Sequence, residues 1–320
     1  MKKTAVAPTN IAFIKYWGRK NEELRLPENG SVSMCLSDMT TTTTVEFSES
    51  FAEDSVTING AGAASEASRV VKHLDRIRAL AGITHKASVV SENSFPTATG
   101  LSSSASGFAA LSLAASSAAG LNVSEKELSI LARQGSGSAC RSIPSGFVEW
   151  LDGSTSETSY AVSLYPPDHW DVIDIVAVVS DDRKDISTSE GQTRFNTSPF
   201  RAARVAGMNS KIVECKKALE TKDFTKLGEI TEAEALNMHA VMLTSQPPLI
   251  YWTPGTLEIM KLVQQWRREG LEVYFTINTG QDIHLLVEAE YKEALLKKLS
   301  LLPLVKSTIV NTPAEGARLV

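Results

Sequence analysis

The chain has 320 residues, of which 42% are hydrophobic and 22% are charged, and its formal net charge is −5. These values are typical of globular proteins and exclude a disordered or membrane-embedded class. The length exceeds the usual size of a single hydrophobic core and therefore indicates two domains. The acidic balance argues against a general nucleic-acid surface, but it permits a local basic pocket for a small anion.

The sequence shows neither a membrane segment nor a secretion signal. No apolar run approaches the roughly 20 residues needed to span a bilayer, and the start MKKTAVAPTN lacks the apolar stretch of a signal peptide. The three cysteines, Cys35, Cys140 and Cys215, are odd in number and lack metal-ligand spacing. We therefore expect free thiols in a reducing compartment, the cytoplasm, and no membrane partner.

In chain order, the first half alternates strands and helices, and the second half begins with long helices. The β-branched run at 40–47 predicts a strand. Apolar residues at helical spacing, followed by glycine, predict a helix at 66–82. Since the pattern changes near residue 180, we expect an α+β protein with two lobes, residues 1–180 and 181–320. The other expected elements are strands at 55–60, 86–93, 146–153 and 172–180, helices at 124–135, 200–239, 255–269 and 290–300, and a strand–turn–strand at 273–287.

The strongest chemical signal is PTATGLSSSASGFAALSLAASSAAG (96–120), where glycine and serines precede a helix of small residues. A helix start presents unpaired N–H groups and the positive end of its dipole, and Gly100 lets the backbone approach an anion closely. A phosphate is therefore the expected ligand. The spacing matches neither G-x-x-x-x-G-K-[ST] nor G-x-G-x-x-G. A serine-rich cap with a small-residue packing face is the alternative.

Two further turns place cations beside small or aromatic residues. RQGSGSACRSIPSG sets Arg141 among serines and glycines, which suits a fork-shaped donor to phosphate or carboxylate, although flexible turns also explain the glycines. NIAFIKYWGRK ends a strand in Lys15, Tyr16 and Arg19, for which a cation–π surface patch is the alternative. Together, three turns rich in cations or N–H groups favour one multiply anionic ligand.

Several stretches along nearly the whole chain carry a family resemblance: APTNIAFIKYWGRK, SENSFPTATGLSSSASGFAAL, ARQGSGSACRS, MHAVMLTSQPPLIY and YFTINTG. Together they resemble the mevalonate diphosphate decarboxylase family, a branch of the galactokinase, homoserine kinase, mevalonate kinase and phosphomevalonate kinase superfamily. The resemblance implies a ribosomal protein S5 domain 2-like N-terminal lobe, a ferredoxin-like C-terminal lobe and an active site between them. It also implies that ATP phosphorylates the C3 hydroxyl of a 5-phosphorylated mevalonate, after which phosphate and carbon dioxide leave.

The same resemblance implies roles for individual residues. ATP with magnesium is the expected cofactor, the metal ligands are left unassigned, and the family usually forms a homodimer. No organic cofactor is needed, because departure of the C3 phosphate leaves an electron-deficient carbon. The implied substrate-binding residues are Tyr16, Arg19, Arg69, Ser136, Ser138 and Arg141, with Lys15 alongside, and Lys15 and Arg141 are also expected to be catalytic. The implied ATP-binding residues are Asn93, Gly100, Ser102, Ser103, Ser104 and Lys184.

The main departure from the family is the turn N-T-G-Q-D, where the family has D-A-G-P-N. The carboxylate expected to orient or deprotonate the C3 hydroxyl is an amide here, Asn278, which can accept a hydrogen bond but cannot take the proton. Asp282 is a second catalytic candidate, and a turn residue is its alternative role. His239 and His284 are candidate proton relays, although a lone histidine is more often structural. An ordinary hairpin turn is the alternative for the whole segment.

The substrate follows from the departures. Arg19 replaces a family lysine, and SIPSGF replaces a glycine-rich stretch, so the phosphate demands differ from those of the common enzyme. We expect (R)-5-phosphomevalonate, giving isopentenyl phosphate, carbon dioxide, ADP and phosphate. The alternatives are a mevalonate diphosphate decarboxylase that gives isopentenyl diphosphate, a C3 kinase without decarboxylation and, last, a non-catalytic binding protein.

Overall fold

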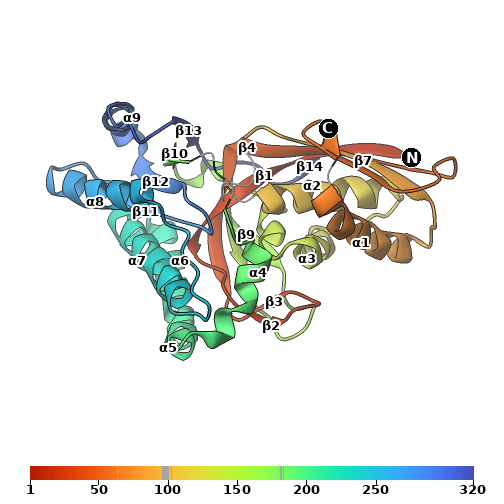
Figure 1. Ribbon diagram of the computed structural model, residues 1–320, viewed down its shortest axis with the longest axis horizontal. Coiled ribbons are helices and arrows are strands. Elements are labelled where there is room, and N and C mark those ends of the chain that lie inside the picture. Colours follow the sequence, from red (N-terminus) through yellow and green to blue (C-terminus); the bar gives the residue numbers. More distant parts are fainter. Residues whose placement is uncertain (63, 96–100, 102, 181, 183) are drawn as a thin grey trace.

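Figure 1 shows the computed structural model, in which two sheets are separated and flanked by helices. The structure describes residues 1–62, 64–95, 101, 103–180, 182 and 184–320. The expectation of a two-lobed α+β fold is confirmed, since helices pack on both sheets. None of the described helices is long and apolar enough to span a bilayer.

The larger sheet forms the N-terminal lobe around two long antiparallel strands. β1 (Lys2–Ile14) and β4 (Ser31–Ser48) pair over most of their length, and the threonine run at 40–44 favours the extended chain of β4. The strand order is β14-β1-β4-β7-β5-β6, and β8 joins the first part of β4 to β9. The remaining strands are β5 (Ser55–Ile58), β6 (Ala61–Gly62), β7 (Lys86–Asn93), β8 (Phe147–Trp150), β9 (Ala161–Tyr165) and β14 (Arg318–Leu319), and β2 (Arg19–Asn21) pairs separately with β3 (Leu26–Pro27).

The larger sheet shares one hydrophobic core with α1 (Ala64–Ala81), α2 (Ser103–Ala118) and α3 (Glu125–Gly135). The alanines and serines of α2 allow it to contact β1 and β4 directly. α3 begins at a capping box formed by Ser124 and Glu127, and a short 3-10 helix, η1 (Gly137–Ser142), follows it. The first turn of α2 and the end of α3 therefore lie side by side beneath the sheet.

The smaller sheet has the order β11-β12-β10-β13 and is antiparallel throughout. Its elements follow one another as βαββαβ, which confirms the expected ferredoxin-like lobe. β10 lies in this sheet although it precedes residue 180, and β14 returns to the larger sheet, so the division at 180 stays a prediction. The elements are β10 (Val172–Val178), β11 (Tyr274–Thr276), β12 (Ile283–Glu288) and β13 (Ser307–Asn311), with α8 (Pro254–Arg268), α9 (Lys292–Ser300), η2 (Pro167–His169) and η4 (Ala289–Tyr291).

The helical region expected at 200–239 is divided. It contains α5 (Arg201–Ala206), α6 (Met208–Thr221) and α7 (Phe224–Leu243), and α4 (Thr188–Thr193) and η3 (Phe195–Thr197) precede it. Lys222, in the left-handed conformation at φ 54°, ends α6, and Asp223 caps α7. α7 contacts both β1 and β11, so this helix connects the two sheets.

A buried ion pair fixes the end of β1 against these helices. Arg204 Nη2 donates to Glu234 Oε1 at 2.5 Å and to the carbonyl of Lys15 at 3.1 Å, and neither the Arg204 nor the Glu234 side chain is exposed. Lys211 Nζ donates to the other oxygen of Glu234 at 2.8 Å. Because an unpaired buried charge is costly, the pair determines where β1 ends relative to α5 and α7.

We expect Arg204→Met to lower the free energy of unfolding by about 3–5 kcal/mol, because the change leaves Glu234 buried with one cation fewer. Urea denaturation of the purified variant measures the loss. Arg194→Met is the matched control, since Arg194 pairs with the exposed Glu190 at 3.0 Å, and an exposed pair contributes about 1 kcal/mol at most. Equal losses in both variants would contradict the account.

Candidate active site

A pocket of about 990 Å³ lies between the lobes and is lined by side chains of both. The N-terminal lobe contributes the end of β1, the start of α2 and η1, and the other lobe contributes residues 184–192 and 278–279. Cations outnumber carboxylates two to one among the lining residues that the structure describes, so the pocket favours anionic ligands. The cations are Lys15, Arg19, Arg25, Arg69, Arg141 and Lys184, and the carboxylates are Glu66, Asp185 and Glu190.

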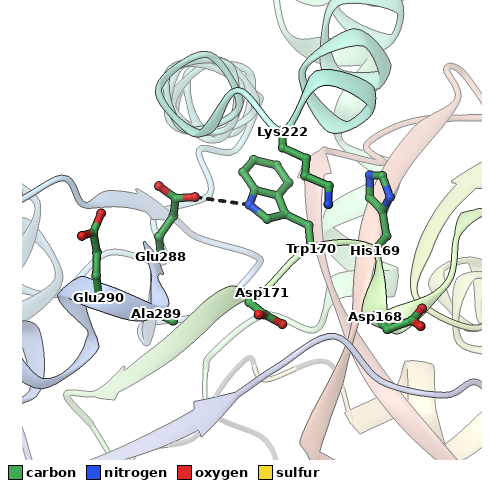
Figure 2. A pocket seen from close by; sticks show the side chains of 8 residues that line it. All are labelled: Asp168, His169, Trp170, Asp171, Lys222, Glu288, Ala289 and Glu290. Carbon is green, nitrogen blue, oxygen red and sulfur yellow. Dashed lines mark hydrogen bonds between the residues drawn. The ribbon is translucent and has the colours of Figure 1, made fainter.

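A smaller pocket, of about 400 Å³, has the opposite character (Figure 2). It lies near η2 and the end of β12, and Trp170 Nε1 donates to Glu288 Oε1 at 3.3 Å across it. Its lining is rich in carboxylates, which disfavour phosphorylated ligands, so the larger pocket is the candidate site. The carboxylates are those of Asp168, Asp171, Glu288 and Glu290.

The K-Y-W-G turn after β1 is anchored in the second lobe. Trp17 is 1% exposed and packs in a cluster with Phe195 and Tyr251, which differs from the surface cation–π patch considered as the alternative. Gly18 has φ 99°, and its N–H donates to Gln192 Oε1 at 2.7 Å. This anchoring leaves Lys15, Tyr16 and Arg19 to line the pocket.

Lys15 is held at the junction of the lobes. Its Nζ donates to Asn278 Oδ1 at 2.9 Å, its side chain is 1% exposed, and it forms no ion pair with a carboxylate in the described part of the chain. Burial and the nearby charge of Arg141 lower the pKa of Lys15 to about 7. Weaker influences come from Glu234 and Asp174, which raise this pKa, and from Arg204, which lowers it.

The turn that carries Asn278 is fixed from both sides. His239 Nε2 donates to the Asn278 carbonyl at 3.0 Å, and burial lowers the pKa of His239 to about 3, so this histidine is neutral and positions the turn. Lys184 Nζ donates to the Thr279 carbonyl at 2.9 Å and to Thr188 Oγ1 at 2.8 Å. Burial lowers the pKa of Lys184 to about 8. The turn joins β11 to β12, so it is a hairpin connection and also part of the pocket.

Asp282 and His284 lie elsewhere. Asp282 is 3% exposed, and its Oδ1 accepts from the Val179 N–H at 3.0 Å. His284 Nδ1 lies 2.9 Å from Asp174 Oδ1 within the smaller sheet. Neither residue is part of the pocket lining. The structure therefore brings Asn278, but not Asp282, together with Lys15.

Arg141 is a buried cation with neutral partners. Its side chain lies in η1, and the residue is 4% exposed. Nη1 donates to Ser31 Oγ at 2.7 Å, and Nε and Nη2 donate to Asn10 Oδ1 at 3.2 and 3.0 Å. The guanidinium also lies 5.8 Å from the Trp150 ring centroid. The arrangement orients the charge without neutralising it, which suits an anionic ligand.

The other expected substrate residues also line this pocket. Tyr16 Oη accepts from Arg19 Nε at 2.7 Å, and a Cβ on Gly137 would lie 2.7 Å from the Tyr16 ring, so this position requires glycine. Arg69 Nη2 donates to the Gly135 carbonyl at 3.5 Å. Ser136 and Ser138 complete the set.

The described ATP-binding candidates lie around the start of α2. Ser103 begins this helix, and Ser104 Oγ lies 3.2 Å from Ser136 Oγ, so the hydroxyl links the helix to the substrate turn. Asn93, at the end of β7, accepts from Thr41 Oγ1 at 2.7 Å. These residues and Lys184 line the pocket. Gly100 and Ser102 lie outside the described residues.

Sequence reasoning missed two parts of the pocket. One is Arg25, which has φ 50° and stands in the stretch ELRLP, where no motif marks it. The other is an apolar wall next to Asn93. The strand at 55–60 was expected, but the inward direction of its side chains depends on pairing with β7. The wall comprises Val56, Ile58, Val70, Val89 and Leu111.

The fold and the site define a class of protein in which the start of a helix opens into a cation-rich cleft between two lobes. Residues 7–161 match the family described as diphosphomevalonate decarboxylase-like N-terminal domain, and residues 174–313 match the mevalonate 5-diphosphate decarboxylase C-terminal domain. The chain belongs to this family of ATP-dependent lyases, which confirms both the resemblance and the expected class of enzyme.

Relatives and solved structures agree with this family assignment. The diphosphomevalonate decarboxylase of Candida albicans is 38% identical over 92% of this chain and 87% of its own. The phosphomevalonate decarboxylase of Haloferax volcanii is 33% identical over 91% of this chain and 90% of its own. The structure "MDDEF in complex with MVAPP, AMPPCP and Magnesium" has a TM-score of 0.94 at 41% identity and covers 100% of this chain and 99% of its own. The mevalonate diphosphate decarboxylase of Staphylococcus aureus has a TM-score of 0.95 at 38% identity. The match covers 100% of this chain and 98% of that chain. The expected fold is confirmed.

We expect the lowered pKa of Lys15 to make stability depend on pH. Between about pH 7 and pH 10 the unfolded chain binds a proton at Lys15 that the folded chain does not, so this group makes the free energy of unfolding rise with pH. Urea denaturation across this range should show a slope steeper by about 1 kcal/mol per pH unit in the wild type than in Lys15→Met. Parallel curves would show that Lys15 titrates normally.

We expect Arg141→Ala to lower kcat/KM about a hundredfold or more, since a charge-assisted pair at a buried position contributes roughly 3 kcal/mol. Arg141→Lys should lower kcat/KM about tenfold, because lysine keeps the charge but lacks the paired donors of the guanidinium group. Steady-state kinetics measures both. Arg267→Ala, which removes an arginine outside the pocket lining, is the control. An Arg141→Ala variant as active as this control would remove Arg141 from the site.

Proposed function

We propose that the protein catalyses the ATP-dependent decarboxylation of a 5-phosphorylated mevalonate and that (R)-5-phosphomevalonate is its preferred substrate. One observation carries the proposal: Lys15 and Arg141, both buried, lie in the same pocket as the start of α2. Neither cation forms an ion pair within the described part of the chain. A ligand with a carboxylate at one end and a phosphate at the other satisfies this arrangement.

The nucleotide fits beside this substrate. The start of α2, with Ser103 and Ser104, and the Lys184 ammonium suit the phosphates, and Asn93 and the apolar wall suit the nucleoside. A related structure contains AMPPCP and magnesium. The described residues hold no cluster of three or more metal-ligating side chains. Asp185 and Glu190 supply hard oxygen ligands, which fits an ion held mainly by nucleotide phosphates and able to neutralise their charge.

The chemistry begins at the C3 hydroxyl. Asn278 Oδ1 accepts from Lys15 Nζ, and an amide oxygen at this position is an acceptor that can orient this hydroxyl. Because the pKa of Lys15 is about 7, a substantial fraction of its side chain is a neutral amine that can take the proton. The hydroxyl oxygen then bonds to the γ-phosphorus of ATP, and ADP leaves. A loose transition state requires alignment more than a strong base.

The second step breaks two bonds. The C3–O bond breaks, and the phosphate takes its electron pair. The pair of the bond between C2 and the carboxylate then forms the C2–C3 double bond, and carbon dioxide leaves. Arg141 and Lys15 are both buried and hold the anions where fixed charges act more strongly than in bulk water.

The choice of the monophosphate rests on the departures at Arg19 and at the turn of Asn278, which alter the anion site. The Haloferax volcanii relative, a phosphomevalonate decarboxylase, supports it. The diphosphate is the second candidate, favoured by relatives such as the Candida albicans enzyme. The homodimer, the cytoplasmic location and the individual site roles stay predictions.

Carbon dioxide release with ATP, measured side by side for the monophosphate and the diphosphate, tests the proposal. We expect release with both and a higher kcat/KM with the monophosphate. A higher value with the diphosphate assigns the second candidate. ADP formation without carbon dioxide identifies a C3 kinase, and the absence of any ATP turnover overturns the proposal.

We expect Asn278→Ala to lose at least about a hundredfold in carbon dioxide release, because the C3 hydroxyl loses its orienting acceptor. Asn278→Asp should retain or raise activity, since a carboxylate both accepts and takes a proton. Asp282→Asn, the control, should stay within about threefold, because an amide oxygen can still accept from the Val179 N–H. A crippled Asp282→Asn beside an active Asn278→Ala would assign the role to Asp282.

A further inference from the structure

Three arginines form one wall of the pocket next to Tyr16: Arg19, Arg25 and Arg69. Arg19 pairs with Glu22 at 2.5 Å, and Arg69 pairs with Glu66 at 3.4 Å. Arg25 forms no ion pair within the described residues. This arginine therefore brings a positive charge to the wall that the protein leaves uncompensated.

The side chain of Arg25 is anchored at one atom. Its Nε donates to the Gln134 carbonyl at 3.2 Å, near the end of α3. Arg69 Nη2 donates to the next carbonyl, that of Gly135, so the two guanidinium groups converge on the same turn. The following residue is Ser136, whose side chain faces the pocket. Helix-end carbonyls attract cations, and this contact by itself could be a simple cap.

Two observations indicate that Arg25 does more than cap the helix. The Arg25 backbone has φ 50°, an unfavourable conformation for a residue with a Cβ, and Arg133 Nε holds the preceding Leu24 carbonyl at 3.1 Å. The other observation is that the Nη1 and Nη2 groups of Arg25 make no hydrogen bond among the described residues. The chain thus fixes the position of Arg25 and leaves its paired donors for a ligand.

The electrostatics agree with this geometry. Burial and the charges of Arg19 and Arg69 lower the pKa of Arg25 to about 10, with a smaller opposing effect from Tyr16 and a further lowering by Arg76. Arg25 therefore stays charged at neutral pH while repelling its neighbours. A phosphate between the guanidinium groups relieves this repulsion and accepts a bidentate pair of hydrogen bonds.

We propose that Arg25 is a further substrate-binding residue, which binds the 5-phosphoryl end of the substrate together with Arg19 and Arg69. The identity of the substrate rests on the proposed function. The assignment of Arg25 to a phosphate rests on the positions and hydrogen bonds of the three arginines.

Kinetics of Arg25→Ala, Arg25→Lys and the control Arg76→Ala test this. Arg76 lies within electrostatic reach of Arg25 but is not part of the pocket lining. Arg25→Ala should raise KM for the phosphorylated mevalonate that the wild type prefers by about 10- to 100-fold, with kcat changed less than about threefold and KM for ATP unchanged. Arg25→Lys should recover part of the loss, and Arg76→Ala should match the wild type.

Calorimetric titration with inorganic pyrophosphate provides a readout that does not depend on turnover. Wild type should bind it at least about tenfold more tightly than Arg25→Ala, whereas unphosphorylated mevalonate should bind equally to both. If the wild type turns over neither phosphorylated mevalonate, the proposed function fails and the pyrophosphate titration still decides the role of Arg25. Equal pyrophosphate binding by wild type and Arg25→Ala, or losses in Arg25→Ala no larger than in Arg76→Ala, overturns the inference.

Discussion

Burial of Lys15 between the two lobes is the constraint on which the site depends. The carbonyl of Lys15 accepts from Arg204 and from Asn29 Nδ2 at 2.9 Å, and its ammonium reaches Asn278 in the other lobe. One residue at the end of β1 is therefore fixed by both halves of the molecule. Because Lys15 is buried and its orienting partner is an amide, its positive charge is destabilised until an anion binds.

Two other cations of the cleft are also held by neutral groups. Arg141 is held by Asn10 and Ser31, and Arg25 by a backbone carbonyl, so neutral groups orient these cations without cancelling their charge. Such a cleft is costly in the free protein and gains stability when phosphates and a carboxylate enter it. Stability and binding are in this sense coupled: the charges that weaken the empty fold are those that hold the ligands.

Much of the fold and of the candidate site could be predicted from the sequence, because the signals lay within short stretches of the chain. The β-branched run of β4, the glycine after α1 and the cations of the Lys15 turn each gave a signal within a short stretch of sequence. What the sequence could not show depended on packing between distant segments. The sequence indicated helices over 200–239 but did not show where one ends and the next begins, which the left-handed Lys222 sets. Asp282 and Asn278 belong to the same turn, and the sequence did not distinguish them. In the structure, Asp282 accepts from the Val179 N–H just after β10. Arg25 carried no motif, since only the fold brings it to the end of α3.

The central claim, that an amide partner leaves Lys15 as a buried and easily deprotonated amine, can be measured directly. NMR titration of the Lys15 side chain, assigned by comparison with Lys15→Met, would give its pKa in the wild type and in Asn278→Asp. The account predicts a value near 7 in the wild type and a clearly higher value in the variant, where a carboxylate replaces the amide. A wild-type value near that of an ordinary lysine, unchanged in the variant, would contradict it.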